Sequence, residues 1–149
     1  IYTNRPQNPP VKIGKGALVQ SSIIGEGTVI QGEVIHSVVF PGVVVEKGVK
    51  IYDSIIFNDS IIKADSFIER SILDKNVIVG EGSIIGIGDD YTPNRLRPDI
   101  LSWGVNLVGK NSQIPPHSII PRNCLIGINV PTSGFGKTTE LKSGSVIMG

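Results

Sequence analysis

The stretch from Ile13 to Ile85, IGKGALVQSSIIGEGTVIQGEVIHSVVFPGVVVEKGVKIYDSIIFNDSIIKADSFIERSILDKNVIVGEGSII, decides the fold of this chain. An apolar residue recurs along it at steps of five or six. Neither the helical period of 3.6 nor the alternation of a long strand has this spacing. The recurring positions are Ile13, Val19, Ile24, Ile30, Ile35, Phe40, Val45, Ile51, Phe57, Ile62, Ile68, Leu73, Val79 and Ile85.

A hexapeptide repeat explains the spacing, because each short strand ends at a corner and the same inward position recurs once per face. At many steps Gly or an acid follows the aliphatic residue, and a small or β-branched residue stands three positions later, as in Ile13-Gly14 with Ala17. Three such faces make one turn, so residues 13–86 hold roughly four coils. The pattern predicts an all-β fold, a parallel β-helix with Ile and Val stacked inside.

The composition agrees with a single domain of this kind. The chain has 149 residues, 40% of them apolar, and its 24 Ile and 16 Val favour strands. No apolar run is long enough to cross a membrane, and no signal peptide is visible. The single Cys124 excludes an internal disulfide and favours a cytoplasmic location. Only eight aromatic residues are present, without a basic cluster among them, which argues against nucleic-acid binding.

Three segments fall outside the first block of repeats. Residues 1–12 contain three Pro and do not begin with Met, and we expect them to be a linker from a preceding domain. Residues 87–107, which include GDDYTPNRLRPD, break the period and are predicted to leave the rod as an inserted loop. Residues 131–149 lose the period and are predicted to form a C-terminal cap or tail.

Between the insertion and the cap the repeat resumes, and the β-helix is expected to span residues 13–130. Ile114, Ile120 and Ile126 lie six residues apart. Cys124 occupies a position where the neighbouring repeats have Ser, so we interpret it as a packed thiol and not as a nucleophile.

Charge is distributed unevenly along the chain. Residues 91–149 carry six Lys or Arg against two Asp or Glu, although the net charge of the chain is only +1. Such a bias can attract phosphate-bearing small molecules or an acidic partner surface, although a solvated face is the more ordinary interpretation. The candidate contacts to an effector or a neighbouring domain are Arg95, Arg97, Arg122 and Lys137.

No catalytic constellation stands out from the repeats. Gly134-Phe135-Gly136-Lys137-Thr138 lacks the earlier Gly and the following helix of a phosphate-binding P-loop. His36 and His117 are candidates for the general base of a hexapeptide acyltransferase, or simply corner residues. Two His residues cannot supply the three ligands of a zinc hydratase. The sequence therefore predicts no catalytic, cofactor-binding or metal-binding residue in this chain.

The coils resemble those of a known family. Asn8-Pro9-Pro10-Val11-Lys12, SSIIGEGTVIQGEV (21–34), SVVFPGVVVEKG (37–48) and DSIIFNDSII (53–62) are similar to the linker and successive coils of the C-terminal β-helix of bacterial glucose-1-phosphate adenylyltransferases. The insertion around Gly88–Asn94 also resembles members with a longer C-terminal region. The resemblance covers about residues 8–130, and it implies that the β-helix is left-handed, against the usual hand of parallel crossovers.

The resemblance implies a non-catalytic role for these residues. In that family ADP-glucose and pyrophosphate are made from ATP and glucose 1-phosphate, for glycogen synthesis, by an N-terminal domain that uses Mg²⁺. None of that domain's motifs is present here. The resemblance implies a domain for assembly, by analogy into a tetramer, and for regulation by sugar-phosphate or phosphate effectors. An acyltransferase using acyl-CoA and a non-enzymatic scaffold remain the alternatives.

Overall fold

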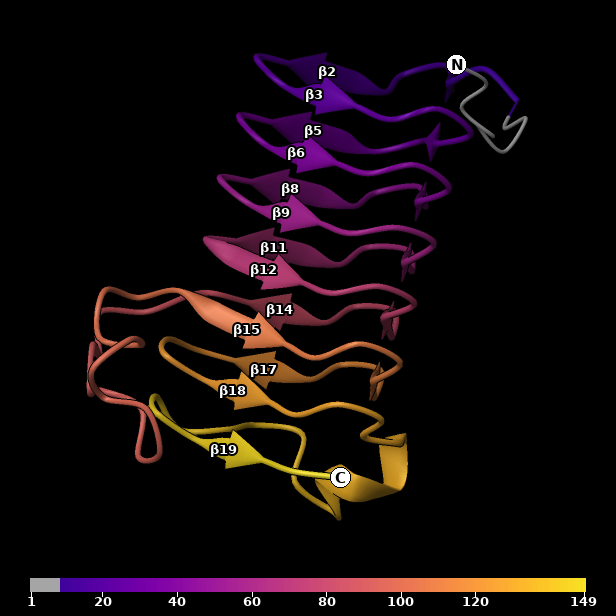
Figure 1. Cartoon of the computed structure of the whole chain (residues 1–149). Helices are drawn as coiled ribbons and strands as arrows, with labels where there is room; N and C mark the ends of the chain where they lie inside the picture. The colour runs from indigo at the N-terminus through magenta and orange to yellow at the C-terminus, as the bar shows by residue number, and fades with distance from the viewer. Residues whose placement is uncertain (1–8) are drawn as a thin grey trace, which may run out of the picture.

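The computed structural model describes residues 9–149, so most of the expected linker, residues 1–8, lies outside the described residues. Short parallel strands form three sheets, which are the three faces of one rod (Figure 1). Sheet A contains β1 (Lys12–Ile13), β4 (Val29–Ile30), β7 (Val44–Val45), β10 (Ile61–Ile62), β13 (Ile78–Val79) and β16 (Gln113–Ile114). Sheet B contains β2 (Leu18–Gln20), β5 (Glu33–Ile35), β8 (Lys50–Tyr52), β11 (Phe67–Glu69), β14 (Ile84–Ile85) and β17 (Ile119–Ile120). Sheet C contains β3 (Ile23–Ile24), β6 (Val38–Val39), β9 (Ile55–Ile56), β12 (Ser71–Leu73), β15 (Asn106–Val108), β18 (Leu125–Ile126) and β19 (Val146–Ile147).

Successive strands visit the three sheets in turn, so each coil adds one strand to every face. Strand β10, for example, pairs with both β7 and β13, and places Ile62 opposite Val45 and Val79. In Figure 1 the chain descends from the N-terminus, runs leftward along sheet B at the back and returns rightward along sheet C at the front. This winding is left-handed, and the predicted β-helix is confirmed.

The core is a stack of aliphatic side chains, one from each strand. The second residue of each two-residue strand points inward, and neighbouring coils place these residues in register. The fully buried inward residues are Ile30, Val34, Val39, Val45, Ile51, Ile56, Ile62, Ile68, Leu73, Val79, Ile85, Ile114, Ile120 and Ile126. Ile13 lies in the first coil and is 55% exposed, because no described coil covers it.

Three of the expected inward positions are wrong by one residue. The core is filled by Val34, Val39 and Ile56, whereas Ile35, Phe40 and Phe57 are only partly buried. At each site two apolar residues stand side by side, so a count of five or six does not distinguish them. The rings of Phe40 and Phe57 stack with their centroids 4.6 Å apart, which gives these outward aromatics a partner in the next coil.

Hydrogen bonds between coils hold the corner that joins sheet B to sheet C. The amide of Ser54 donates to the hydroxyl of Ser37 (3.1 Å), and the amide of Ser71 donates to the hydroxyl of Ser54 (3.2 Å). Each of these hydroxyls in turn donates to a carbonyl two residues earlier in its own coil. The buried serines are therefore satisfied, and they tie successive coils together.

The insertion leaves the rod at this same corner. The loop runs over residues 86–105, and Asn106 and Leu107, which were expected inside it, belong to β15. Strand β15 returns into sheet C opposite β12, with Val108 beside Leu73, in the register that an uninterrupted coil has. The insertion, which we call the arm (residues 86–105), therefore adds to the surface without disturbing the stack (Figure 1).

The C-terminal residues close the lower end of the rod. A short 3-10 helix, η1 (Thr132–Phe135), places the buried side chain of Phe135 in the core, and β19 extends sheet C beside β18. Cys124 is fully buried, and burial raises the pKa of its thiol. The cysteine is therefore a packed thiol, as its position in the repeat predicts.

Candidate interaction surface

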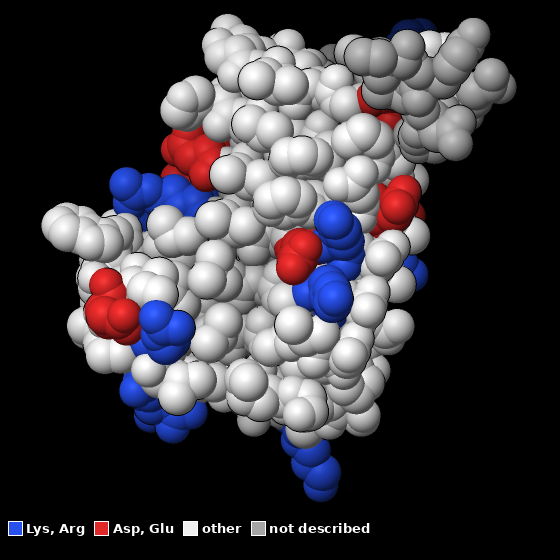
Figure 2. Space-filling model, in the orientation of Figure 1, with Lys and Arg blue, Asp and Glu red and all other residues white. Residues whose placement is uncertain are grey.

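The outer face of sheet C carries a continuous row of aliphatic side chains. In each strand of sheet C, the residue just before the inward one lies in register with its equivalent in the next coil, from β3 to β19. We call these seven residues the apolar row: Ile23, Val38, Ile55, Ile72, Leu107, Leu125 and Val146. Ile23 is 70% exposed and the others are partly exposed. Figure 2 shows this face as an uncharged band, with the charged side chains to its sides.

The apolar row is the longest aliphatic run among the three outward registers, since that of sheet A has four aliphatic residues between two polar ones: Lys12, Val29, Val44, Ile61, Ile78 and Gln113. The corresponding outward register on sheet B is Leu18, Glu33, Lys50, Phe67, Ile84 and Ile119, which mixes both charges with apolar residues. Parallel sheets are usually covered on both faces, and an uncharged, uncovered face of this length marks a contact surface. Sequence analysis missed it, although doubled aliphatic pairs such as Ile55-Ile56 are its visible signal.

The arm is fixed to the rod by two buried asparagines. Asn123 accepts a hydrogen bond from the amide of Gly104 (2.7 Å) and donates to the carbonyls of Tyr91 and Thr92 (both 3.2 Å). Asn94 donates to the carbonyl of Asn123 (2.8 Å), and its own carbonyl accepts two amides of the arm. The arm is therefore an ordered element, and sequence analysis identified neither asparagine.

Arg122, a candidate effector contact, is part of this attachment. Its side chain is largely buried, its Nε donates to the carbonyl of Gly88 (2.9 Å), and its guanidinium lies 5.3 Å from the centre of the Tyr91 ring. One Nη lies 3.5 Å from a carboxylate oxygen of Glu69. The other Nη is buried and has no hydrogen-bond partner among the described residues. The structure thus gives Arg122 contacts within the chain.

The other three candidates lie at the surface. Arg95 and Arg97 are exposed in the arm, and Arg97 pairs with Asp99 (3.2 Å), a hydrogen bond that raises the pKa of the arginine and lowers that of the acid. Lys137 is exposed just after η1. No hydrogen bond or ion pair between described residues joins any two of the four candidates. The arm also exposes three large apolar side chains, Trp103 at 80%, Leu96 at 56% and Ile100 at 52%.

The two histidines occupy different corners. His36 and His117 both have a positive φ, 50° and 58°, as corner residues of this fold do. The Nδ1 of His36 lies 2.6 Å from a carboxylate oxygen of Asp53, its neighbour in the next coil, at the rim of a groove of about 460 Å³. Ile55, Ile72, Arg70 and Val105 also line this groove. His117 stacks against Gly82 on another corner, so the histidines do not form a common site.

Within residues 9–149, no group of three or more His, Cys, Asp or Glu side chains converges as metal ligands do. The described part of the chain also contains no helix with the length and apolar character that a membrane span requires.

The fold and its coil sequences place the chain in a family. Residues 9–108 match the family model described as GlmU-like, C-terminal hexapeptide, and the chain belongs to that family. It is also similar to glucose-1-phosphate adenylyltransferases: 47% identical over 148 residues to the enzyme of Thermotoga neapolitana, and 48% identical over 149 residues to that of Ruminiclostridium cellulolyticum. These matches confirm the resemblance seen in the coils.

The matches also show what share of each relative's length aligns with this chain. They cover 99% and 100% of this chain but only 34% and 35% of the two relatives, so the chain spans about a third of their length. Among solved structures, the acetyltransferase domain of PglB from Neisseria gonorrhoeae FA1090 aligns over 95% of this chain and 56% of that one, at 19% identity and a TM-score of 0.33.

Proposed function

We propose that this chain is the C-terminal β-helix of a glucose-1-phosphate adenylyltransferase. The whole protein makes ADP-glucose and pyrophosphate from ATP and glucose 1-phosphate in the cytoplasm, for glycogen synthesis. The catalytic domain, with its Mg²⁺, precedes the residues described here. The observation that carries the proposal is near-complete coverage of the chain by relatives of that name, at 47% and 48% identity.

The β-helix itself serves assembly in this proposal. Seven side chains at the roughly 4.8 Å spacing of paired strands make the apolar row about 29 Å long. A stable interface needs about 800 Å² from each partner, so a strip of this length can form its centre. The occupant we propose is the same face of a second copy, because a flat, uncharged surface is complementary to itself across a twofold axis. This contact pairs two copies, and a second surface joins two such pairs into the tetramer.

Regulation is the second part of the proposal. Arg95, Arg97 and Lys137 are exposed cations that suit a phosphate-bearing effector or an acidic surface of the catalytic domain. Arg122 contributes by holding the arm that carries the first two. The proposed effectors are sugar phosphates and inorganic phosphate.

The test is an assay of the full-length protein alongside the 149-residue chain. We expect the full-length protein to form ADP-glucose from ATP and glucose 1-phosphate with Mg²⁺, and the 149-residue chain to be inactive. Full-length protein that releases no pyrophosphate with this pair, but does so with another nucleotide or sugar phosphate, would contradict the named reaction. A coding sequence without a nucleotidyltransferase domain before Ile1 would contradict the whole assignment.

One observation favours the acyltransferase alternative. The His36–Asp53 pair (2.6 Å) at the rim of an apolar groove has the form of an oriented general base. Acetyl-CoA binding at micromolar affinity by the 149-residue chain, lost in His36→Ala and kept in His117→Ala, would support that alternative. We expect no such binding.

A further inference from the structure

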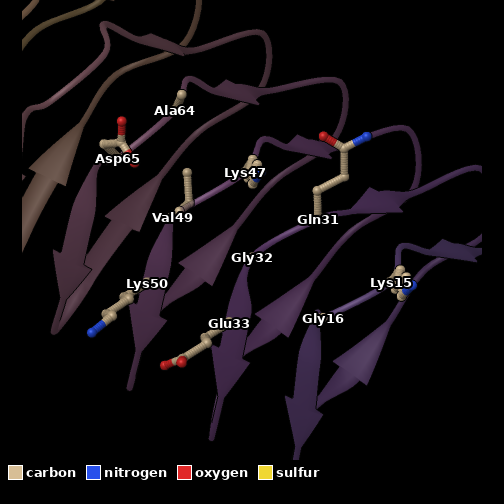
Figure 3. A pocket seen from close by; sticks show the side chains of 11 residues that line it. Lys15, Gly16, Gln31, Gly32, Glu33, Lys47, Val49, Lys50, Ala64 and Asp65 are labelled. Carbon is tan, nitrogen blue, oxygen red and sulfur yellow. The ribbon is translucent and has the colours of Figure 1, made fainter.

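The two exposed aromatic side chains of residues 9–149 both lie in the arm. Trp103 is 80% exposed and Tyr91 is 43% exposed, whereas the other described aromatic residues are partly or fully buried. For comparison, the cavity of about 480 Å³ at the corner that joins sheet A to sheet B is lined by Lys15, Lys47 and other residues without an aromatic ring (Figure 3). Large aromatic side chains exposed on an ordered element mark a contact surface.

The side chain of Asn123 holds the two segments that carry these aromatics. Its oxygen accepts the amide of Gly104, directly after Trp103, and its nitrogen donates to the carbonyl of Tyr91. A Cβ at Gly104 would lie 2.6 Å from Cε1 of Tyr91, so the ring lies against the backbone that follows Trp103. The largely buried Arg122 supports the same ring from the side of the rod. The surface is therefore ordered before any partner binds, which lowers the entropy lost on binding.

Two acids stand directly before Tyr91 in the arm. Asp89 and Asp90 are exposed, and one oxygen of Asp90 accepts hydrogen bonds from the hydroxyl (2.5 Å) and the amide (3.0 Å) of Thr92, which lower the pKa of Asp90. The other oxygen of Asp90 and the carboxylate of Asp89 have no hydrogen-bond partner among the described residues. The arm thus presents aromatic rings next to carboxylates that can still accept a cationic partner.

This combination suits a Pro-rich segment that carries an arginine. Such segments bind aromatic surfaces as polyproline II helices, in which prolines three residues apart lie on one side, about 9 Å from each other. The sequence has one pair of prolines at this spacing, in Arg5-Pro6-Gln7-Asn8-Pro9. Residues 1–12 contain two cations, Arg5 and Lys12, and no acid, so their side chains carry a charge opposite to that of Asp89 and Asp90.

We propose that the arm binds the segment Arg5–Pro9 of a second copy of this chain. Pro6 and Pro9 pack against Tyr91 and Trp103, and the arginine of the segment pairs with the two acids before Tyr91. The arm is a different surface from the apolar row, and the contact does not depend on the reaction proposed above.

The place where the described chain begins decides which copy supplies the segment. The chain enters the rod at β1 in sheet A, whereas the arm leaves from the corner between sheets B and C, which is opposite sheet A. In sheet B four coils separate β2 from β14, about 19 Å at the roughly 4.8 Å spacing of paired strands. Pro9 stands three residues before Lys12 of β1, a reach of at most about 11 Å. The segment that reaches the arm therefore comes from another copy.

The experiment uses Trp103 as the reporter, because it is the single Trp of the chain. A peptide of residues 1–12, which contains no Trp, is titrated into the 149-residue chain while the emission of Trp103 is followed. We expect a saturable shift of the emission to shorter wavelength as the ring leaves water. A peptide with Asn8 and Pro9 exchanged keeps its composition and charge but has no two prolines three residues apart. It should bind at least about tenfold more weakly.

Two variants of the arm and one control locate the contacts. Tyr91→Ala should weaken binding of the peptide about tenfold, the loss typical of a central aromatic contact. Asp89→Asn combined with Asp90→Asn should weaken it about two- to fivefold, because exposed ion pairs contribute modestly. Asp59→Asn combined with Asp65→Asn removes the same charge from two corners of the coils and should bind as the unchanged chain does.

Dilution of the chain without peptide tests whether the segment comes from a second copy. The emission of Trp103 should shift to shorter wavelength as the concentration of the unchanged chain rises, and should stay constant in a chain with Pro6→Ala and Pro9→Ala. A shift that is present at every concentration, and is lost in that variant, would assign the contact to the chain's own segment and overturn the proposal. A concentration-dependent shift that persists in that variant would overturn it too, because another surface would then cover Trp103.

The peptide titrations supply three more results that would overturn the proposal. They are no saturable shift with the peptide, equal binding of the exchanged peptide, and equal loss of binding in the two double Asp variants. The two peptides are compared on the unchanged chain, so they decide the question even if Tyr91→Ala does not fold. None of these outcomes bears on assembly through the apolar row or on whether the full-length protein makes ADP-glucose.

Discussion

The regular coils and the arm are stabilised in different ways. In the coils each inward aliphatic lies directly on the same position of its neighbours, as Ile62 lies between Val45 and Val79. In the arm only Leu101 is a buried aliphatic, and the attachment consists of hydrogen bonds from Asn94, Asn123 and Arg122. A solenoid is a sum of repeats and their interfaces, so damage to a coil spreads along the stack, whereas damage to the arm should remain local.

The largest effect is expected from a charge placed inside the stack. Ile62→Asp buries an unpaired carboxylate among aliphatic side chains, which costs at least about 4 kcal/mol and should unfold the neighbouring coils. The measurement is thermal unfolding followed by circular dichroism, whose starting spectrum should show strand and almost no helix. Ile61→Asp is the matched control, because Ile61 points outward in the same strand, and it should melt within a few degrees of the unchanged chain. Equal melting of Ile62→Asp and the unchanged chain would contradict the stacked core.

A smaller and local effect is expected at the arm. Asn123→Ala removes three hydrogen bonds and leaves buried backbone groups unpaired, which costs about 2–3 kcal/mol. Hydrogen exchange should become faster over residues 86–105 and stay unchanged in β7 to β13. Asn76→Ala is the control, since Asn76 has nearly the same φ (56° against 58°) and its side chain has no hydrogen bond to any described residue. Faster exchange throughout the rod in Asn123→Ala would show that the arm and the coils are not independent.

The same contrast explains what the sequence could predict. Local spacing identified the coils and the core position of Ile62, because the inward residue recurs every five or six positions. The spacing failed by one residue at Ile35, because the neighbouring Val34 is equally apolar. The corner after Ile30 is short, so the next inward residue, Val34, follows Ile30 after only four positions. That irregular step is the visible sign that only Gln31 and Gly32 separate β4 from β5. The pair of His36 and Asp53 was also accessible, because they lie 17 residues apart, one coil.

The arm could be located but not described from the sequence. Its boundaries follow from the loss of the period, and they were correct to within two residues at the C-terminal end. Its attachment was not predictable, because Asn94 and Asn123 are 29 residues apart and meet only after the chain has left the rod and returned. Polar contacts of this kind have no periodic signal, so Arg122 was taken as a surface cation although it is largely buried.

The apolar row provides a third prediction, which concerns contacts between molecules. Ile72→Lys places a charge in the middle of the row and should weaken self-association of the full-length protein by about 1–3 kcal/mol, the range of an interface residue near the centre of a contact. Light scattering coupled to size-exclusion chromatography measures the resulting smaller species. Ile84→Lys is the control, since Ile84 points outward from sheet B, and it should leave the assembly unchanged. Smaller species with Ile84→Lys and an unchanged assembly with Ile72→Lys would instead place the interface on sheet B.

The smallest effect is expected from the exposed arginines of the arm. Changing Arg95 and Arg97 together to Ala should leave the stability of the coils unchanged, because exposed ion pairs such as that of Arg97 with Asp99 contribute little. If these guanidinium groups contact an effector, the full-length protein should respond to sugar bisphosphates and inorganic phosphate at concentrations roughly two- to fivefold higher. Lys142→Ala, which removes an exposed charge from the cap, is the control.

The Asn123→Ala variant sharpens this last comparison. The arm presents both arginines only while Asn123 and Arg122 hold it against the rod, so loosening the arm should weaken the effector response at least as much as removing the two charges. A response lost in Asn123→Ala but kept in the double arginine variant would assign regulation to the position of the arm and not to its charges. If oligomeric state and effector response both match the unchanged protein in the double variant, Arg95 and Arg97 are solvated surface residues.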